Sequence, residues 1–235
     1  LIMIFVTIMI PLIILLIYHS FYATKVVYNQ VAESNKNMMT LYMNQIDQNM
    51  EDIDKYLSRL QALNYDLQIM EYSSTDESNY LLARMRLYNK VLDDIPIFNS
   101  ISFVFIYASQ RNDFMRIDNS GATQDAIIGQ DDIKQYILEL TEAEQQGWNV
   151  AEFGQNYYLT RILRMGNIYI GAAGNAKGMM VPINMIDFGE YGASMLVANG
   201  SPVTNEQLIR ENDIKLDLDL SQYHLLGEDE QFLLV

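Results

Sequence analysis

The chain begins with a run of apolar residues, 1–18, and the sequence after Tyr18 is polar and patterned. Within this run only Thr7 and Pro11 are not plainly apolar, and no residue is charged. An α-helix of this length covers roughly 27 Å, which is close to the hydrocarbon thickness of a bilayer. Proline is tolerated in membrane helices, so Pro11 is compatible with a span. The pattern predicts a transmembrane anchor over residues 1–19, in a cell membrane.

Two observations favour an uncleaved anchor over a secretory signal peptide. The apolar run is longer than a signal peptide requires, and the sequence that follows, YHSFYATKVV, has no clear small-residue cleavage site. Its aromatic residues are typical of a membrane interface. We expect residues to precede Leu1, because the chain does not begin with Met. The flank whose charges would show the orientation is therefore missing, and we expect the remainder to be extracytoplasmic.

A long helix is expected next, because residues 21–70 contain neither Pro nor Gly. Apolar residues recur along it at the 3.5-residue spacing of a helix seam, at Met39, Met43, Ile46, Met50, Ile53, Leu57, Leu60 and Leu67. Asn64 interrupts this stripe, and a polar residue in a seam often fixes register. Two interpretations stay open: the stripe packs on its own domain, or it also pairs with a second copy to form a homodimer. Both predict a stalk over residues 20–71.

Helices and strands alternate beyond the stalk. Residues 80–92 predict a helix with Leu81, Met85, Tyr88 and Leu92 on one face, which ends before Pro96. β-branched and aromatic runs predict one hairpin from 101–107 and 114–118, and another from 157–163 and 168–173. Helices are expected over 131–146, capped by Asp131 and Asp132, over 177–188 with an interruption near Pro182, and over 204–210. Strands are expected over 193–198, before an Asn-Gly turn, and over 231–235, where the chain stops inside a domain. The fold class is α+β.

Composition narrows the function. A formal net charge of −15 argues against nucleic-acid binding, which needs a basic surface. The absence of Cys excludes disulfides, thiolate metal sites and Cys nucleophiles, and two His residues leave little for a Ser-His-Asp site. The segment GAAGNAKG lacks a phosphate-binding motif and is explained as a turn after a strand. We therefore expect no catalytic residue, no metal site and no cofactor.

The order of these elements resembles that of Cache-type (double Cache, PAS-like) extracellular sensor domains of bacterial membrane receptors. The matching segments are the anchor with its unbroken helix, NSISFVFIYASQRNDFMRIDNSG, YYLTRILRMGNIYIGAAGNA, MMVPINMIDFGE and GASMLVANGSPVTN. The chain is most similar to the sensor region of YesM-type sensor histidine kinases, and transmembrane AraC-type regulators carry a similar sensor. The resemblance implies signal transduction in a two-component system. An anchored adhesion or scaffold domain without signalling is the alternative.

The resemblance also implies the domain organisation and a pocket. It places a membrane-distal PAS-like module over residues 72–176, and a connecting helix with an incomplete membrane-proximal module over residues 177–235. Any kinase domain would lie beyond the C-terminus, so this chain is not expected to be an enzyme. The implied pocket would take a small-molecule ligand, with candidate contacts at Tyr107, Arg116, Trp148, Tyr158, Arg161, Tyr169 and Asp187.

Two of these candidates have an alternative interpretation. Arg161 lies in a predicted strand between apolar residues, where it could hold a ligand carboxylate through two parallel hydrogen bonds. It could equally pair with one of the many acidic residues of this chain. Trp148, the only Trp, is either a core residue or a stacking wall for a ligand.

Overall fold

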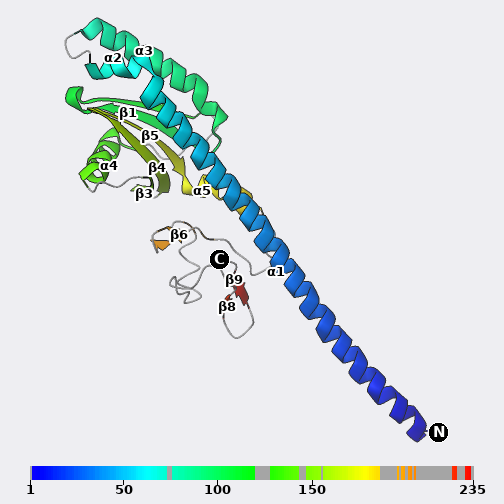
Figure 1. The fold of residues 1–235 in the computed structure, drawn as a ribbon. Helices are drawn as coiled ribbons and strands as arrows, with labels where there is room; N and C mark the ends of the chain where they lie inside the picture. Colours follow the sequence, from blue (N-terminus) through cyan, green and yellow to red (C-terminus); the bar gives the residue numbers. More distant parts are fainter. Residues whose placement is uncertain are drawn as a thin grey trace.

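A computed structural model describes residues 2–72, 76–119, 128–142, 147–154, 156–185, 195, 197–198, 201–202, 204, 224–226 and 231–233. Most of these residues form a long N-terminal helix and a five-stranded antiparallel sheet that carries helices on both faces (Figure 1). The predicted α+β fold class is confirmed.

The first helix, α1, joins the apolar segment and the stalk without a break. It spans Ile2–Leu63, with Pro11 inside it. Its 62 residues correspond to about 93 Å at 1.5 Å per residue. Its N-terminal part projects away from the sheet, and its C-terminal part runs along it (Figure 1). Among the described residues, α1 is the one helix long and apolar enough to cross a membrane.

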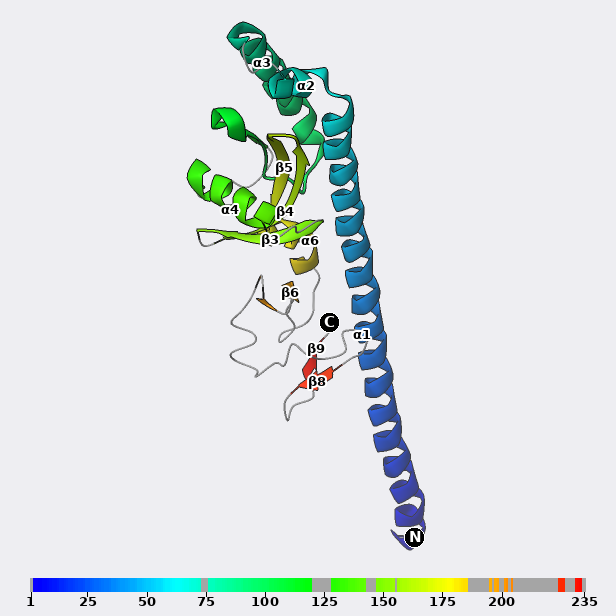
Figure 2. The ribbon, with the colours of Figure 1, turned by 60° about the vertical axis from the view of Figure 1, so that its left-hand side comes forward.

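The stalk helix ends earlier than the sequence predicts. After Leu63 the chain changes direction, and a separate helix, α2, spans Tyr65–Tyr72 (Figure 2). The side-chain carbonyl of Asn64 accepts hydrogen bonds from the backbone N–H groups of Asp66 (2.9 Å) and Leu67 (3.2 Å). This is how an N-cap residue satisfies the first free N–H groups of a helix. The interpretation of Asn64 as a register-fixing seam residue is therefore wrong.

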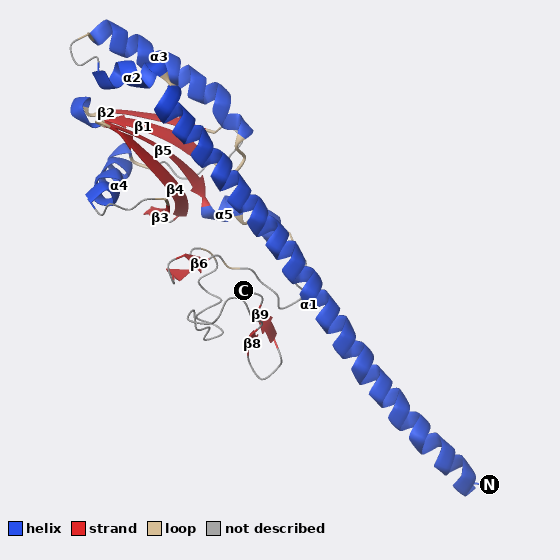
Figure 3. Ribbon diagram, in the orientation of Figure 1, coloured by secondary structure: helices blue, strands red, loops and turns tan. Residues whose placement is uncertain are grey.

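The sheet contains β1 (Phe103–Ala108), β2 (Asp113–Asp118), β3 (Trp148–Phe153), β4 (Asn156–Met165) and β5 (Ile168–Asn175). All neighbours are antiparallel, in the order β2-β1-β5-β4-β3 (Figure 3). Both predicted hairpins are confirmed. The first turns through a 3-10 segment, η2 (Ser109–Arg111), and through Asn112 at a φ of 50°; the second turns at Gly166, at a φ of 58°.

Helices cover both faces of the sheet. One face, here called the α1 face, lies against α1, α2 and α3 (Glu77–Asp94); the other, the α4 face, lies against α4 (Gln130–Glu142) (Figures 1 and 2). Ile53, Leu57 and Leu60 of α1 are buried with the side chains of β1 and β5 on the α1 face. The apolar stripe therefore packs on its own domain over this stretch, as the first interpretation of it proposes.

Two of the predicted helices differ in detail from the structure. The α3 helix is capped by Asp76, whose side chain accepts a hydrogen bond from the backbone N–H of Asn79 at 3.1 Å, and a 3-10 turn, η1 (Ile95–Ile97), follows the helix. Its buried residues are Tyr80, Ala83, Leu87 and Val91, whereas Leu81, Met85 and Leu92 of the predicted face are exposed. In α4, Asp131 and Asp132 occupy the first turn rather than the cap, where a negative charge still favours the helix dipole.

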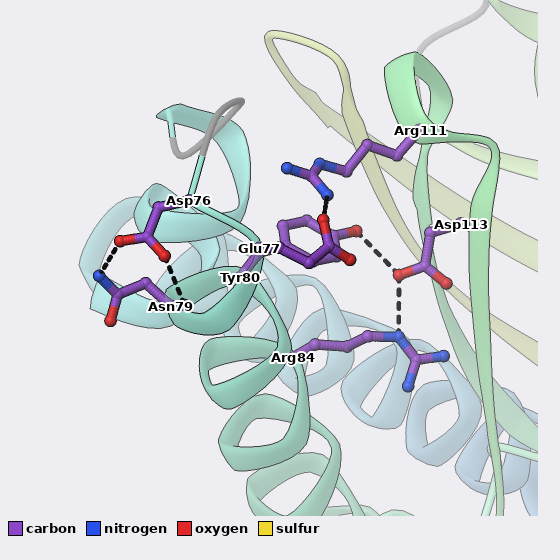
Figure 4. A network of polar contacts seen from close by, with 7 residues as sticks. All are labelled: Asp76, Glu77, Asn79, Tyr80, Arg84, Arg111 and Asp113. Atoms are coloured by element: carbon purple, nitrogen blue, oxygen red, sulfur yellow. Dashed lines mark hydrogen bonds and ion pairs between the residues drawn. The ribbon is translucent and has the colours of Figure 1, made fainter.

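A polar network ties α3 to the β1–β2 hairpin (Figure 4). The carboxylate of Asp113 accepts hydrogen bonds from the hydroxyl of Tyr80 and from Nε of Arg84, each at 2.8 Å. Arg111 donates to Glu77 at 2.6 Å, and its guanidinium carbon lies 4.1 Å from the centre of the Tyr80 ring. The network holds the N-terminal half of α3 on the β1–β2 hairpin.

The glycines of GAAGNAKG do not mark a turn directly after a strand, as the sequence suggests. Gly171 and Gly174 lie inside β5. A β-carbon at position 171 would meet the ring of Phe105, and one at 174 would meet the carbonyl oxygen of Ser100. Glycine is therefore needed here for close approach rather than for turning.

Two short helices follow β5: α5 (Ala176–Met179) and α6 (Val181–Asn184). Their junction at Met180 agrees with the predicted interruption near Pro182. Beyond them the structure describes two small hairpins, β6 (Val197–Ala198) with β7 (Ser201–Pro202), and β8 (His224–Leu226) with β9 (Gln231–Leu233). Except for Thr204, the predicted helix over 204–210 lies outside the described residues.

Candidate functional site

The structure divides the predicted ligand contacts between the two faces of the sheet. Tyr107, Arg116, Tyr158 and Tyr169 lie on the α4 face, where the strand register sets Tyr107 opposite Tyr169. Trp148 and Arg161 lie opposite each other on the α1 face. Asp187 lies outside the described residues. The sheet therefore separates the predicted contacts that the structure describes into two groups.

Aromatic rings fill the α4 face. We call this group the α4-face cluster; it consists of Phe103, Phe105, Tyr107, Phe114, Phe153, Tyr158 and Tyr169. The rings of Tyr107 and Tyr169 are stacked with their centres 6.1 Å apart, and those of Phe153 and Tyr158 lie 5.6 Å apart. Ile133 and Ile137 of α4 close over them. Three predicted contacts, Tyr107, Tyr158 and Tyr169, are thus members of a packed aromatic core.

Three cations lie over rings of the α4-face cluster. The guanidinium carbon of Arg116 is 4.1 Å from the centre of the Phe103 ring, and that of Arg164 is 5.5 Å from the Tyr169 ring. Nζ of Lys134 in α4 lies 5.8 Å from the Tyr107 ring. Such contacts are attractive because the ring face is negative. The arrangement could accept an anionic group at its edge, with Arg116 already paired to Asp118 at 2.7 Å.

Lys134 and Arg164 were not among the predicted contacts, although the position of Arg164 could have been predicted from the sequence. The predicted hairpin turns at Gly166 and Asn167, and counting back from that turn sets Arg164 opposite Tyr169, as the structure has it. Lys134 carried no such signal, because its place over Tyr107 depends on how α4 docks on the sheet.

A buried hydrogen bond joins α4 to β4 beside the cluster. The hydroxyl of Tyr136 lies 2.7 Å from Oγ1 of Thr160. The Thr160 hydroxyl in turn donates a hydrogen bond to the backbone carbonyl of Asn149 at 3.1 Å. Burial raises the pKa of Tyr136 above its usual value. Burial therefore favours the neutral phenol, which joins α4 to β4 through its hydrogen bond with Thr160.

Arg161 ties the sheet to the long helix. Its Nε donates to Oδ1 of Asp54 in α1, and its Nη1 donates to the carbonyl of Gly147 at 3.3 Å. The side chain is 17% exposed. The geometry therefore matches the second interpretation of Arg161, in which it pairs with an acidic residue of its own chain. Trp148 packs beside it against the buried residues of the α1 face, in the manner of a core residue.

Two cavities lie elsewhere in the described part of the chain, and no predicted contact lines either of them. One, of about 430 Å³, lies between the ends of α1 and α3 and is lined by Tyr56, Lys90 and Asp94 among others. The other, of about 440 Å³, lies between α1 and the α5–α6 segment. Within the described ranges, no three His, Asp or Glu side chains gather closely enough to hold a metal ion.

Comparison with protein-family models, with curated proteins and with solved structures finds no match to this chain. What the described residues show is a long N-terminal helix followed by a five-stranded antiparallel sheet.

Proposed function

We propose that this chain is the extracytoplasmic ligand-sensing region of a bacterial transmembrane signalling receptor, of the Cache type found in two-component sensor histidine kinases. One observation carries the proposal. The helix that begins with the apolar segment also supplies Ile53, Leu57 and Leu60 to the core under the sheet. Because core packing tolerates little displacement, a shift of the strands in the sheet module would also displace the helix that enters the membrane.

The route from a ligand to this helix runs through β4. Tyr158 and Thr160 of this strand face α4, whereas Arg161 faces α1 and donates to Asp54. Two more polar contacts join α1 to the module, from Gln61 Nε2 to the carbonyl of Arg164 (2.7 Å) and from Asn49 Nδ2 to Ser100 Oγ (3.0 Å). A ligand on the α4 face would signal if it favoured one of two packings of β4 against α1.

The proposal includes a homodimer through α1, although through a different stripe from the one that the sequence singles out. Ile53, Leu57 and Leu60 are occupied by the module itself. A second set, Val27, Val31, Met38 and Leu41, is exposed in the part of α1 that projects from the sheet. Their spacing of 4, 7 and 3 residues is that of a two-helix seam. Two chains anchored side by side in one membrane would bring these stripes together.

The test is a ligand screen on the full chain in lipid nanodiscs. Thermal unfolding would be followed with amino acids, small carboxylates, sugars and metal ions, because a ligand that binds only the folded state raises the melting temperature with dose. For an anionic hit we expect Arg116→Gln, on the α4 face, to abolish the shift. The matched control, Arg86→Gln, alters a half-exposed arginine of α3, away from the α4 face, and should preserve the shift.

A second measurement separates a sensor from a scaffold. Because the chain contains no Cys, cysteines introduced at the exposed positions Gln48 in α1 and Glu152 in β3 would be the only sites for spin labels. We expect a hit to change the distance between these labels. If no compound stabilises a well-folded chain, or if a bound compound leaves the distance unchanged, an anchored adhesion or scaffold domain becomes the better assignment. The sensor of an AraC-type regulator would behave like that of a kinase.

A further inference from the structure

A cavity of about 440 Å³ lies where α1 passes the end of the sheet. Its walls come from α1, from the segment between η1 and β1, and from the end of β5 with α5 and α6. Next to it, Met180 and Ile183 pack against Tyr42 and Ile46 of α1. The volume falls in the range of small-molecule binding pockets.

In the part of the chain that the structure describes, the polar side chains that line this cavity are all uncharged. Besides the hydroxyl of Tyr42, they are the amides and hydroxyls of Gln45, Asn49, Asn99, Ser100, Ser102 and Asn175. None of the described lining residues is Asp, Glu, Lys, Arg or His, although Asp, Glu, Lys and Arg make up 19% of the chain. An ion that left water for this cavity would find no opposite charge, which is costly. The described lining therefore offers no opposite charge to a charged ligand and disfavours its binding.

Hydrogen bonds hold the inner side of the cavity in place. Asn49 Nδ2 donates to Ser100 Oγ at 3.0 Å, and Ser102 Oγ accepts from the backbone N–H of Asn175 at 3.1 Å. The side-chain carbonyl of Asn175 accepts from the N–H of Gly178 at 3.2 Å. Ser102 and Asn175 are 8% and 6% exposed. This side of the cavity is therefore formed in advance, which reduces the entropy lost on binding.

The outer side keeps hydrogen-bonding groups available. Gln45 and Asn99 are exposed, and their amides form no hydrogen bond with any residue that the structure describes. Each amide offers two donors and one acceptor oxygen. Tyr42, Met179 and Pro182 add an apolar wall. An apolar wall with a few convergent neutral polar groups is the usual composition of a small-molecule site.

We propose that this cavity is a binding site, distinct from the α4 face, for a small neutral ligand that carries hydroxyl or amide groups. Binding there does not depend on the proposed sensory function. A ligand in the cavity would touch α1, the start of β1 and the α5–α6 segment at once, so it would bridge the long helix and the part of the chain that leads to β6.

The test measures binding to the full chain in lipid nanodiscs by calorimetry. The neutral probes are D-glucose, N-acetylglucosamine and N-acetylglycinamide, which offer hydroxyls, both groups and amides respectively. The charged probes are glucosamine, glucuronate and N-acetylglycinate, which match the neutral probes in size. We expect saturable binding of at least one neutral probe, and binding of its charged counterpart weaker by about tenfold or more.

Variants at the outer side of the cavity test whether the probe binds there. Gln45→Ala and Asn99→Ala each remove one neutral hydrogen bond and should weaken binding of the neutral probe by about fivefold. Both side chains are exposed, so neither change should impair folding. Gln48→Ala alters an exposed glutamine of the same helix that does not line the cavity, and should bind the probe as the unaltered chain does.

Three results would overturn the inference: no saturable binding of any neutral probe, equal affinity for charged and neutral probes, or unchanged affinity in both Gln45→Ala and Asn99→Ala. A failure of the proposed sensory function looks different. In that case a neutral probe binds the cavity and the variants weaken its binding, yet no hit of the ligand screen changes the distance between spin labels at positions 48 and 152.

Discussion

Arg161 in β4 donates a hydrogen bond to Asp54 in α1, across 107 positions of the chain. The side chains are 17% and 39% exposed, so the pair lies at the edge of the core rather than on the open surface. Arg161 also holds the carbonyl of Gly147, the residue before β3. One guanidinium thus connects the helix that starts in the apolar segment with two strands of the sheet.

The first prediction concerns this pair. We expect Arg161→Ala to lower the free energy of unfolding by about 2 kcal/mol, because it leaves Asp54 and a carbonyl without their donor. A double-mutant cycle with Asp54→Ala should give a coupling of about 1 kcal/mol, measured by urea unfolding followed by circular dichroism. Lys55→Ala breaks a pair with Glu51 whose two side chains are half exposed, and should cost less than about 0.5 kcal/mol. A coupling near zero would show that the pair does not hold α1 on the sheet.

The second prediction tests whether α1 belongs to the core. Leu57 is fully buried on the α1 face, whereas Leu63, at the end of the same helix, is 79% exposed. Leu57→Ala should destabilise the fold by about 3 kcal/mol, since it removes buried methyl groups and leaves a cavity. Leu63→Ala should change stability by less than about 0.5 kcal/mol. The fluorescence of Trp148, the only Trp of the chain, reports unfolding on this face. Equal effects at the two positions would contradict the packing of α1.

The third prediction concerns the break between α1 and α2. Asn64→Ala removes the carbonyl that accepts from the N–H groups of Asp66 and Leu67, and should cost about 1 kcal/mol. Asn64→Asp keeps an acceptor and should preserve most of the stability, as measured by the same urea titration. If Asn64→Asp is as destabilising as Asn64→Ala, the residue does not act as a cap.

The sequence was sufficient for the elements whose periodicity is long and regular. The apolar run and the Pro- and Gly-free stretch predicted α1, and β-branched runs with clear turns predicted β1, β2, β4 and β5. The strand β3 was missed. It lies at the edge of the sheet, and its sequence WNVAEF shows only a partial alternation, because one side of an edge strand is half-buried.

The sequence was enough to assign side chains to the two faces of the sheet. It was not enough to identify which residue of α1 pairs with Arg161. Alternate residues of a strand point to opposite faces, so the odd spacing between Tyr158 and Arg161 already separates them. The sequence could not identify Asp54 as the partner of Arg161, because α1 carries many acidic residues and only the docking of the helix decides which one meets β4. The same limit applied to Lys134 and to the uncharged cavity, whose walls come from three distant segments.

The fourth prediction is an alkaline limit on stability to which Tyr80 contributes. Burial is the main cause that raises the pKa of Tyr80 above its ordinary value near 10, and the hydrogen bond to Asp113 adds to it. Because the pKa is higher in the folded chain, the unfolded chain loses the phenolic proton first. The contribution to stability is therefore complete below about pH 10 and declines as the pH rises further.

Tyr80→Phe separates this effect from the rest of the molecule. At neutral pH the variant should lose about 1 kcal/mol, because the hydrogen bond from the hydroxyl to Asp113 is gone while Arg84 still pairs with that carboxylate. Between about pH 9 and about pH 11 it should lose less stability than the unaltered chain, since the buried phenol is absent. Tyr65→Phe, at an exposed position, controls for the loss of a phenol. Parallel pH profiles for Tyr80→Phe and the unaltered chain would show that Tyr80 does not limit alkaline stability, and that the bond in Figure 4 contributes little to holding α3 on the sheet.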